Sequence, residues 1–245
     1  MRQSPLFSNI QTGEAYYDDV DRATYKGITL KTVFLLLLSV IIAAFTAFAL
    51  PSIIQYNYSA FYATLMISSI VGLICVFVGR SSERKAKYAA VIYSACEGLF
   101  LGSISAIAEM YIPGAVTTAL FSTLIIFAVM LTLFATGIIR VGNKFRSFCW
   151  AFTIGALAIV LMMSIFSLFI TDYGKYLGVM ILVELFLLIY GSITLALNFA
   201  EANAVVDMGA SKDAEWSVSL GLMISIVYIY VEVLRLMILL VGRDS

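Results

Sequence analysis

Four ionisable residues lie inside long apolar runs of this sequence: Glu97, Glu184, Glu232 and Arg235. If these runs cross a membrane, an ionised side chain within one costs roughly 2.5 to 3.5 kcal/mol, so each needs a partner or a function. Arg235 follows Glu232 by three residues, and this spacing puts both on one helix face, where the guanidinium can neutralise the carboxylate. Three carboxyl groups then share one arginine, so at least one must carry a proton or bind a cation.

Two interpretations of these acids stay open. In the functional one they form a proton-sensitive cation site in the core of a helical bundle, with calcium a candidate ligand of Glu232 and Glu184 because hard cations prefer carboxylate oxygens. In the structural one, Glu232 and Arg235 only fix helix packing, while Glu97 and Glu184 are protonated and hydrogen-bonded. The residues favour function for Glu232 and do not decide for the other two. Tyr228 shares the face of Glu232, as a hydrogen-bond donor or as a packing aromatic.

The composition indicates a membrane protein. Hydrophobic residues make up 62% of the 245 residues, charged residues only 12%, and the mean hydropathy is +1.01. Soluble domains carry roughly 25% charged residues, so most of the exterior must face lipid. The net charge is zero and no basic face is visible, and we therefore expect no nucleic-acid partner.

Histidine is absent. Its absence excludes Ser/His and Cys/His catalysis, HExxH zinc sites and haem ligation by histidine. The three cysteines, Cys75, Cys96 and Cys149, show no metal-binding spacing and are interpreted as packing residues. We therefore expect that the protein is not an enzyme and has no cofactor, apart from the candidate calcium.

Seven apolar runs are long enough to cross a bilayer, which needs roughly 20 residues. We predict an all-α membrane protein, a bundle of seven transmembrane helices, with a break at Pro51 with Asn57 and a polar tail over residues 1–30 before the transmembrane domain 31–245. The predicted spans are Thr32–Leu50, Tyr58–Gly79, Ala86–Ala108, Ala115–Ile139, Phe148–Ile170, Tyr176–Phe199 and Trp216–Val241.

Lysine and arginine gather in the N-terminal tail and in the second and fourth connections, whereas the first and third connections have none. The positive-inside rule then predicts a multi-pass protein of the plasma (inner) membrane with a cytoplasmic N-terminus and an external C-terminus. With this orientation, counting about 1.5 Å per residue puts Glu97, Glu184 and Glu232 in one layer near the middle of the membrane. Gly98 and Gly102 form a GxxxG face that lets another helix approach beside Glu97.

Three segments carry a family resemblance: "YAAVIYSACEGLFLGSISAIAE", "TGIIRVGNKFR" and "EWSVSLGLMISIVYIYVEVLRLM". In order and spacing, over approximately residues 30 to 241, the chain resembles the bacterial branch of the Bax inhibitor family. The resemblance implies a fold in which six helices surround a central seventh span. It also implies a pH-dependent calcium leak, sensed by one acid on span 6 and one on span 7.

The resemblance carries over to single residues unevenly. "YVEVLRL" assigns the span 7 acid to Glu232, with Ser225 as the alternative register. In "LALNFAEANAVV", Asn198 and Ala200 occupy the positions where an acid is usual, so that Glu201, Glu184 or Glu97 would have to supply the second carboxyl. The family's basic residue near the start of span 3 corresponds to Arg84 or Lys85, which would otherwise be positive-inside anchors.

Two functions follow as hypotheses. The first is a cation leak or channel gated by protonation of buried carboxylates, whose partners are the bilayer and calcium or protons. The second is a membrane scaffold with a structural polar core, in which the N-terminal tail recruits protein partners that the sequence does not identify.

Overall fold

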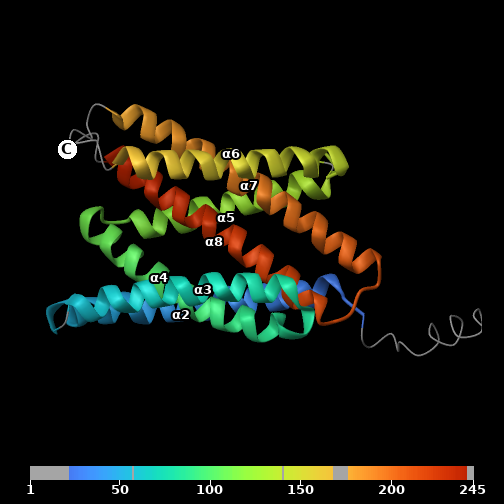
Figure 1. The fold of residues 1–245 in the computed structure, drawn as a ribbon, viewed down its shortest axis with the longest axis horizontal. Coiled ribbons are helices and arrows are strands. Elements are labelled where there is room, and N and C mark those ends of the chain that lie inside the picture. Colours follow the sequence, from blue (N-terminus) through green and yellow to red (C-terminus); the bar gives the residue numbers. More distant parts are fainter. Residues whose placement is uncertain (1–21, 57, 140, 168–175, 242–245) are drawn as a thin grey trace, which may run out of the picture.

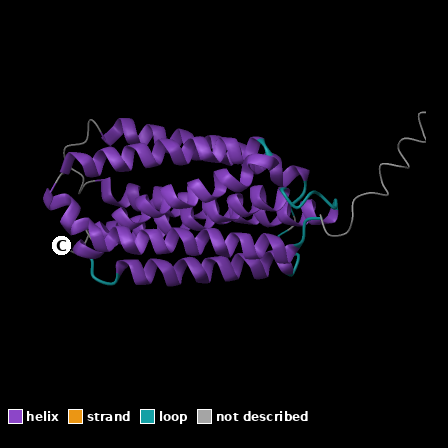
Figure 2. Cartoon of the chain, turned by 90° about the horizontal axis from the view of Figure 1, so that it is seen from below, coloured by secondary structure: helices purple, strands orange, loops and turns teal. Residues whose placement is uncertain are grey.

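The computed structural model describes residues 22–56, 58–139, 141–167 and 176–241, and over these ranges the chain is helical except for short connections and one isolated β-bridge, Arg22–Ser211. Figures 1 and 2 show the helices running roughly side by side along the long axis of the molecule. The described residues form seven helices: α2 (Tyr25–Tyr56), α3 (Tyr58–Ser81), α4 (Glu83–Tyr111), α5 (Ala115–Ala135), α6 (Asn143–Ser167), α7 (Leu177–Asp207) and α8 (Ala214–Val241).

Five of the described helices are long and apolar enough to cross a membrane: α2, α4, α5, α7 and α8. The described parts of α3 and α6 contain shorter apolar stretches, Leu65–Ser81 and Ser147–Met163. The predicted all-α membrane protein is thus confirmed, while the seven crossings stay a prediction.

The helices differ from the predicted spans mainly at their ends. The predicted break, Pro51 with Asn57, starts too early, because α2 continues through Pro51 to Tyr56 and α3 begins at Tyr58. Transmembrane helices tolerate an internal proline when neighbouring groups satisfy the freed carbonyl. Helix α7 extends eight residues past the predicted end at Phe199, so Glu201 lies on the helix instead of in a loop.

Residues 22–30 belong to the folded bundle and not, as predicted, to a polar tail; residues 1–21 lie outside the described residues. The backbone N–H of Ala23 donates to Ala210 O (2.8 Å), and the N–H of Thr24 donates to Glu215 Oε1 (2.7 Å). Lys31 Nζ lies 2.6 Å from Glu215 Oε2, and this carboxylate is buried. The start of α2 is therefore tied to the start of α8.

Helix α8 occupies the middle of the bundle. Figure 1 shows it crossing obliquely between one group, α2, α3 and α4, and a second group, α5, α6 and α7. It contacts α2, α3, α4, α5 and α7, whereas α6 packs only against α7 in the part of the chain that is described. Leu220, Met223 and Ile229 of α8 are fully buried. Helix α8 is thus central among the described helices, with contacts to five of them, whereas the resemblance implied six around a central span; that α8 is a seventh crossing stays a prediction.

Helix α4 lies against α2 through the predicted glycine face. A Cβ atom on Gly98 would lie 2.7 Å from the backbone oxygen of Ser39, and one on Gly102 would collide with the backbone of Ala43. Beside this contact, Ser94 Oγ donates to Leu35 O at 2.5 Å. The GxxxG prediction is confirmed, with α2 as the partner helix.

Candidate functional site

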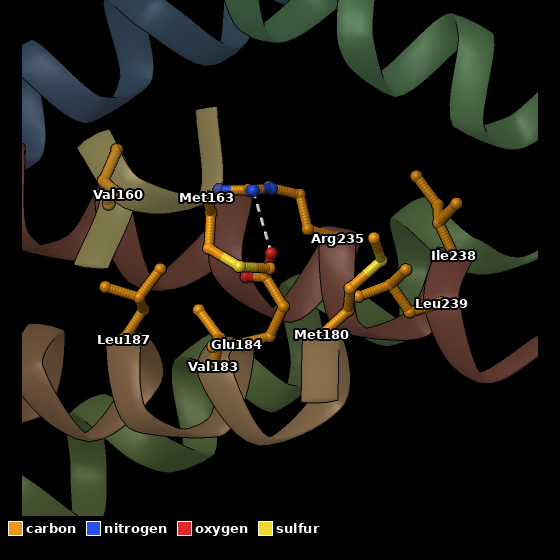
Figure 3. Close-up of a pocket in the computed structure, with 9 residues that line it drawn as sticks. All are labelled: Val160, Met163, Met180, Val183, Glu184, Leu187, Arg235, Ile238 and Leu239. Carbon is orange, nitrogen blue, oxygen red and sulfur yellow. Dashed lines mark ion pairs between the residues drawn. The ribbon is translucent and has the colours of Figure 1, made fainter. Parts of the chain in front are cut away.

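The central feature of the site is an arginine shared by two buried acids. Arg235 Nη2 lies 2.8 Å from Glu184 Oε1, and Arg235 Nη1 lies 3.7 Å from Glu232 Oε1. The side chains of Glu184 and Glu232 are only 6% and 4% exposed, whereas Arg235 is 51% exposed. The closer partner of Arg235 is thus the acid on α7, and the ion pair joins α7 to α8 (Figure 3).

The two carboxyl groups also face each other. They are close enough to interact electrostatically, and Glu184 Oε2 and Glu232 Oε2 are buried and have no hydrogen-bond donor among the described residues. Two ionised carboxylates are both acceptors and repel each other at such a separation, whereas one proton between them supplies the missing donor. Charge counting leads to the same result, since one guanidinium compensates one carboxylate and leaves the second to be neutralised.

Two tyrosines border the acid pair. Tyr228 of α8 lies one turn before Glu232 on the same helix, near enough to interact with it electrostatically. Its ring packs edge-on against Tyr190 of α7, with centroids 5.9 Å apart. Gly191 makes room for this packing, because a Cβ there would lie 2.7 Å from the Tyr228 ring.

A cavity of about 390 Å³ opens beside the ion pair, between α6, α7 and α8. Glu184 and Arg235 form part of its wall, and the rest is apolar. Figure 3 shows the carboxylate of Glu184 and the guanidinium of Arg235 pointing toward each other, with Met163 of α6 beside them. The apolar lining residues are Val160, Met163, Met180, Val183, Leu187, Ile238 and Leu239.

Glu97 does not join this group. Its electrostatic neighbour is Tyr93, one turn earlier on the same helix. The α4 face beside Glu97 packs against α2, and α4 makes no contact with α7 among the described residues. The expectation that all three glutamates share one site is therefore wrong, because a common depth does not give a common direction.

A second polar cluster joins α7 to α8 nearer the start of α8. Asn198 Nδ2 donates to Ser225 Oγ (2.6 Å) and to the backbone oxygen of Gly221 (3.0 Å). Next to it, Arg80 of α3 pairs with Glu201 at 3.1 Å, and both side chains are partly exposed. In this part of the interface the buried members, Asn198 and Ser225, have neutral side chains.

The contacts in the two clusters can be compared with the residues that the family resemblance assigned to the pH sensor. Asn198, at the span 6 position where an acid is usual, contacts Ser225 and not Glu232. This contact favours the alternative register, in which Ser225 and not Glu232 takes the position of the span 7 acid. The basic residue beside the cluster is Arg80, which sequence reasoning missed, whereas Arg84 is exposed at the start of α4. Arg80 directly follows the apolar run that ends at Gly79, and this position at the end of a predicted span was the sequence feature that could have identified it.

The described residues contain no group of three or more acidic, cysteine or histidine side chains that could hold a metal ion. Glu184 and Glu232 offer two carboxyl groups, and Arg235 already contacts one oxygen of each. Calcium binds six to eight oxygens, so a resident calcium does not fit this arrangement. The pair is suited instead to binding and releasing a proton.

Comparison with known proteins returned a match to one family model, described as Bax inhibitor 1 like, over residues 4–242. Neither the curated proteins nor the solved structures gave a match. The matched range covers all seven described helices and both polar clusters.

Proposed function

The chain belongs to the Bax inhibitor 1 like family, and from this premise we propose that it is a pH-sensitive cation leak, with calcium the favoured ion, controlled by protonation of Glu184 and Glu232. The observation that carries the proposal is the pair of buried carboxyl groups that share Arg235 across the α7–α8 interface. Membership of the bacterial branch, the plasma membrane and the cytoplasmic N-terminus stay predictions from the sequence.

The charge of this group changes with its protonation. With one proton on the pair, the two carboxyl groups and Arg235 are neutral together. When that proton leaves, one negative charge is uncompensated in largely apolar surroundings, which is energetically costly unless water or a cation enters. Repulsion between the carboxylates also weakens the contact that holds α7 to α8. The protonated group therefore favours a closed bundle, and the deprotonated group favours an open one that attracts cations.

Calcium flux from reconstituted liposomes tests this function. We expect flux through the wild type to rise with pH as the shared proton is lost. Glu232→Gln leaves Glu184 paired with Arg235 and removes the shared proton, so that flux stays low and independent of pH. Glu83→Gln removes an exposed carboxylate at the start of α4, away from the group, and is expected to keep the wild-type profile.

Two results would contradict the proposal. Wild-type liposomes that leak no faster than empty ones would exclude a cation leak, and a pH-dependent flux that survives Glu232→Gln would assign the sensor to other residues. Calcium-free experiments with sodium or potassium gradients identify the ion, since the two carboxylates alone do not select calcium.

A further inference from the structure

The acid pair lies much closer to one end of α8 than to the other. Glu232 is nine residues from Val241 and eighteen from Ala214, which corresponds to about 14 Å and about 27 Å along the helix axis. Glu184 lies seven residues, or about 11 Å, from the start of α7 at Leu177. Because α7 and α8 are antiparallel, both acids are nearest to the same membrane face, the one at which α8 ends.

The cavity beside the pair extends toward this face. Along α7 its lining runs from Leu187 past Glu184 to Met180, and along α8 it runs from Arg235 to Leu239. Along α8 the lining moves outward from the ion pair by about one helical turn, and along α7 it spans about one turn on either side of Glu184. A volume of about 390 Å³ holds several waters, each of which occupies about 30 Å³ in the liquid. The half-exposed guanidinium of Arg235 gives such waters a polar partner next to Glu184.

The opposite direction along α8 is densely packed. Between Glu232 and the start of the helix, Leu220, Met223 and Ile229 are fully buried. The hydrogen bonds of Asn198 to Ser225 and Gly221 hold α7 against this same part of α8. A proton from that face would have to pass this packed segment, in which the buried α8 residues from Val218 to Val227 have neutral side chains.

The surroundings of the pair leave few other groups that titrate. Arg235 and Tyr228 on α8 and Tyr190 on α7 are the charged or titratable side chains that the structure records beside it within the described ranges. Met163, which α6 contributes to the cavity, carries no charge. A pH response read through the cavity would therefore belong to the two glutamates.

We infer that Glu184 and Glu232 exchange their proton with the face of the membrane at which α8 ends, through the cavity between α6, α7 and α8, and not with the face at which α8 begins. The flux consequence of this inference rests on the proposed function, whereas the water access of the cavity does not. By the predicted orientation, the sensed compartment is the exterior.

Cysteine accessibility tests the route without requiring any ion flux. In a variant whose native Cys75, Cys96 and Cys149 are replaced by serine, Leu239→Cys lines the cavity and Met223→Cys is the matched control on the packed half of α8. A charged, membrane-impermeant thiol reagent is applied to either face of oriented proteoliposomes. We expect Leu239→Cys to react only from the face at which α8 ends, and Met223→Cys to react from neither.

The pH of each compartment is then changed separately while calcium flux is measured. We expect up to about a tenfold change in flux per pH unit on the face where α8 ends, and none on the other. Labelling of Met223→Cys from the face where α8 begins, an unreactive Leu239→Cys, or a flux that follows the pH of the opposite face would overturn the inference. Absent flux at every pH with the expected labelling would overturn the proposed function alone.

Discussion

Replacing Arg235 with methionine isolates the energetic role of the shared arginine. The variant keeps most of the side-chain length but leaves Glu184 and Glu232 buried without an opposite charge. Removal of one partner of a buried ion pair costs about 3 to 5 kcal/mol, and because Arg235 is half exposed we expect about 3 kcal/mol. For a chain of this size, such a loss lowers Tm by roughly 6 to 12 °C.

The sign of the pH dependence follows from the charges. In the Arg235→Met variant, a second proton on the acid pair removes the uncompensated charge, whereas the wild type has no need of it. The destabilisation is therefore largest at high pH and shrinks as the pH falls. Thermal unfolding of the purified protein in detergent at several pH values measures it, with a thiol-reactive dye that reports exposure of the buried Cys75 and Cys149.

Arg80→Met is the matched control for this experiment. Arg80 also pairs with a glutamate of α7, but both side chains are partly exposed, and such pairs contribute about 1 kcal/mol or less. Equal Tm losses in the two arginine variants would refute the reasoning, as would a loss in Arg235→Met that is the same at every pH.

Three further predictions concern the bundle and its ends. Gly98→Leu forces α4 away from the backbone of α2 and is expected to lower Tm by more than the same change at Gly155, where a Cβ meets nothing; equal losses would contradict the close contact. Deletion of residues 1–28 removes the contacts of Ala23 and Thr24 and should lower Tm below that of a chain without residues 1–21; equal Tm values would show that these contacts contribute nothing. A cysteine placed after Val241 should react only from the outside, and labelling from the cytoplasm would exclude seven crossings.

The sequence predicted a common depth for the buried acids, which stays a prediction, and it did not predict the direction of each acid around its helix axis. Depth follows from counting residues along an apolar run, because the helical rise is constant. Direction depends on how neighbouring helices rotate and pack. Glu97 and Glu184 have the same predicted depth, and yet only Glu184 joins the α7–α8 interface. The same limit explains Arg235, whose local partner Glu232 was predicted and whose closer partner Glu184 was not.

Small residues were informative in a similarly incomplete way. The Gly98 and Gly102 spacing predicted that a helix approaches closely, and the structure confirms this, although nothing in the sequence identified α2 as that helix. Asn198 gave the opposite problem. An asparagine where an acid was expected indicated that the site had changed. Its contact with Ser225 could not be predicted, because it depends on how α7 is aligned against α8.

That register also explains how one interface can hold two different clusters. Glu184 and Asn198 are fourteen residues apart on α7, and Ser225 and Glu232 are seven apart on α8, so each spacing is close to a whole number of helical turns. Both clusters therefore lie on a single seam, the neutral one nearer the start of α8 and the ionisable one nearer its end. Loss of the shared proton weakens only the ionisable end, since the hydrogen bonds of Asn198 do not depend on it. Separation of α7 from α8 in the proposed leak would accordingly begin at the cavity and pivot about Asn198.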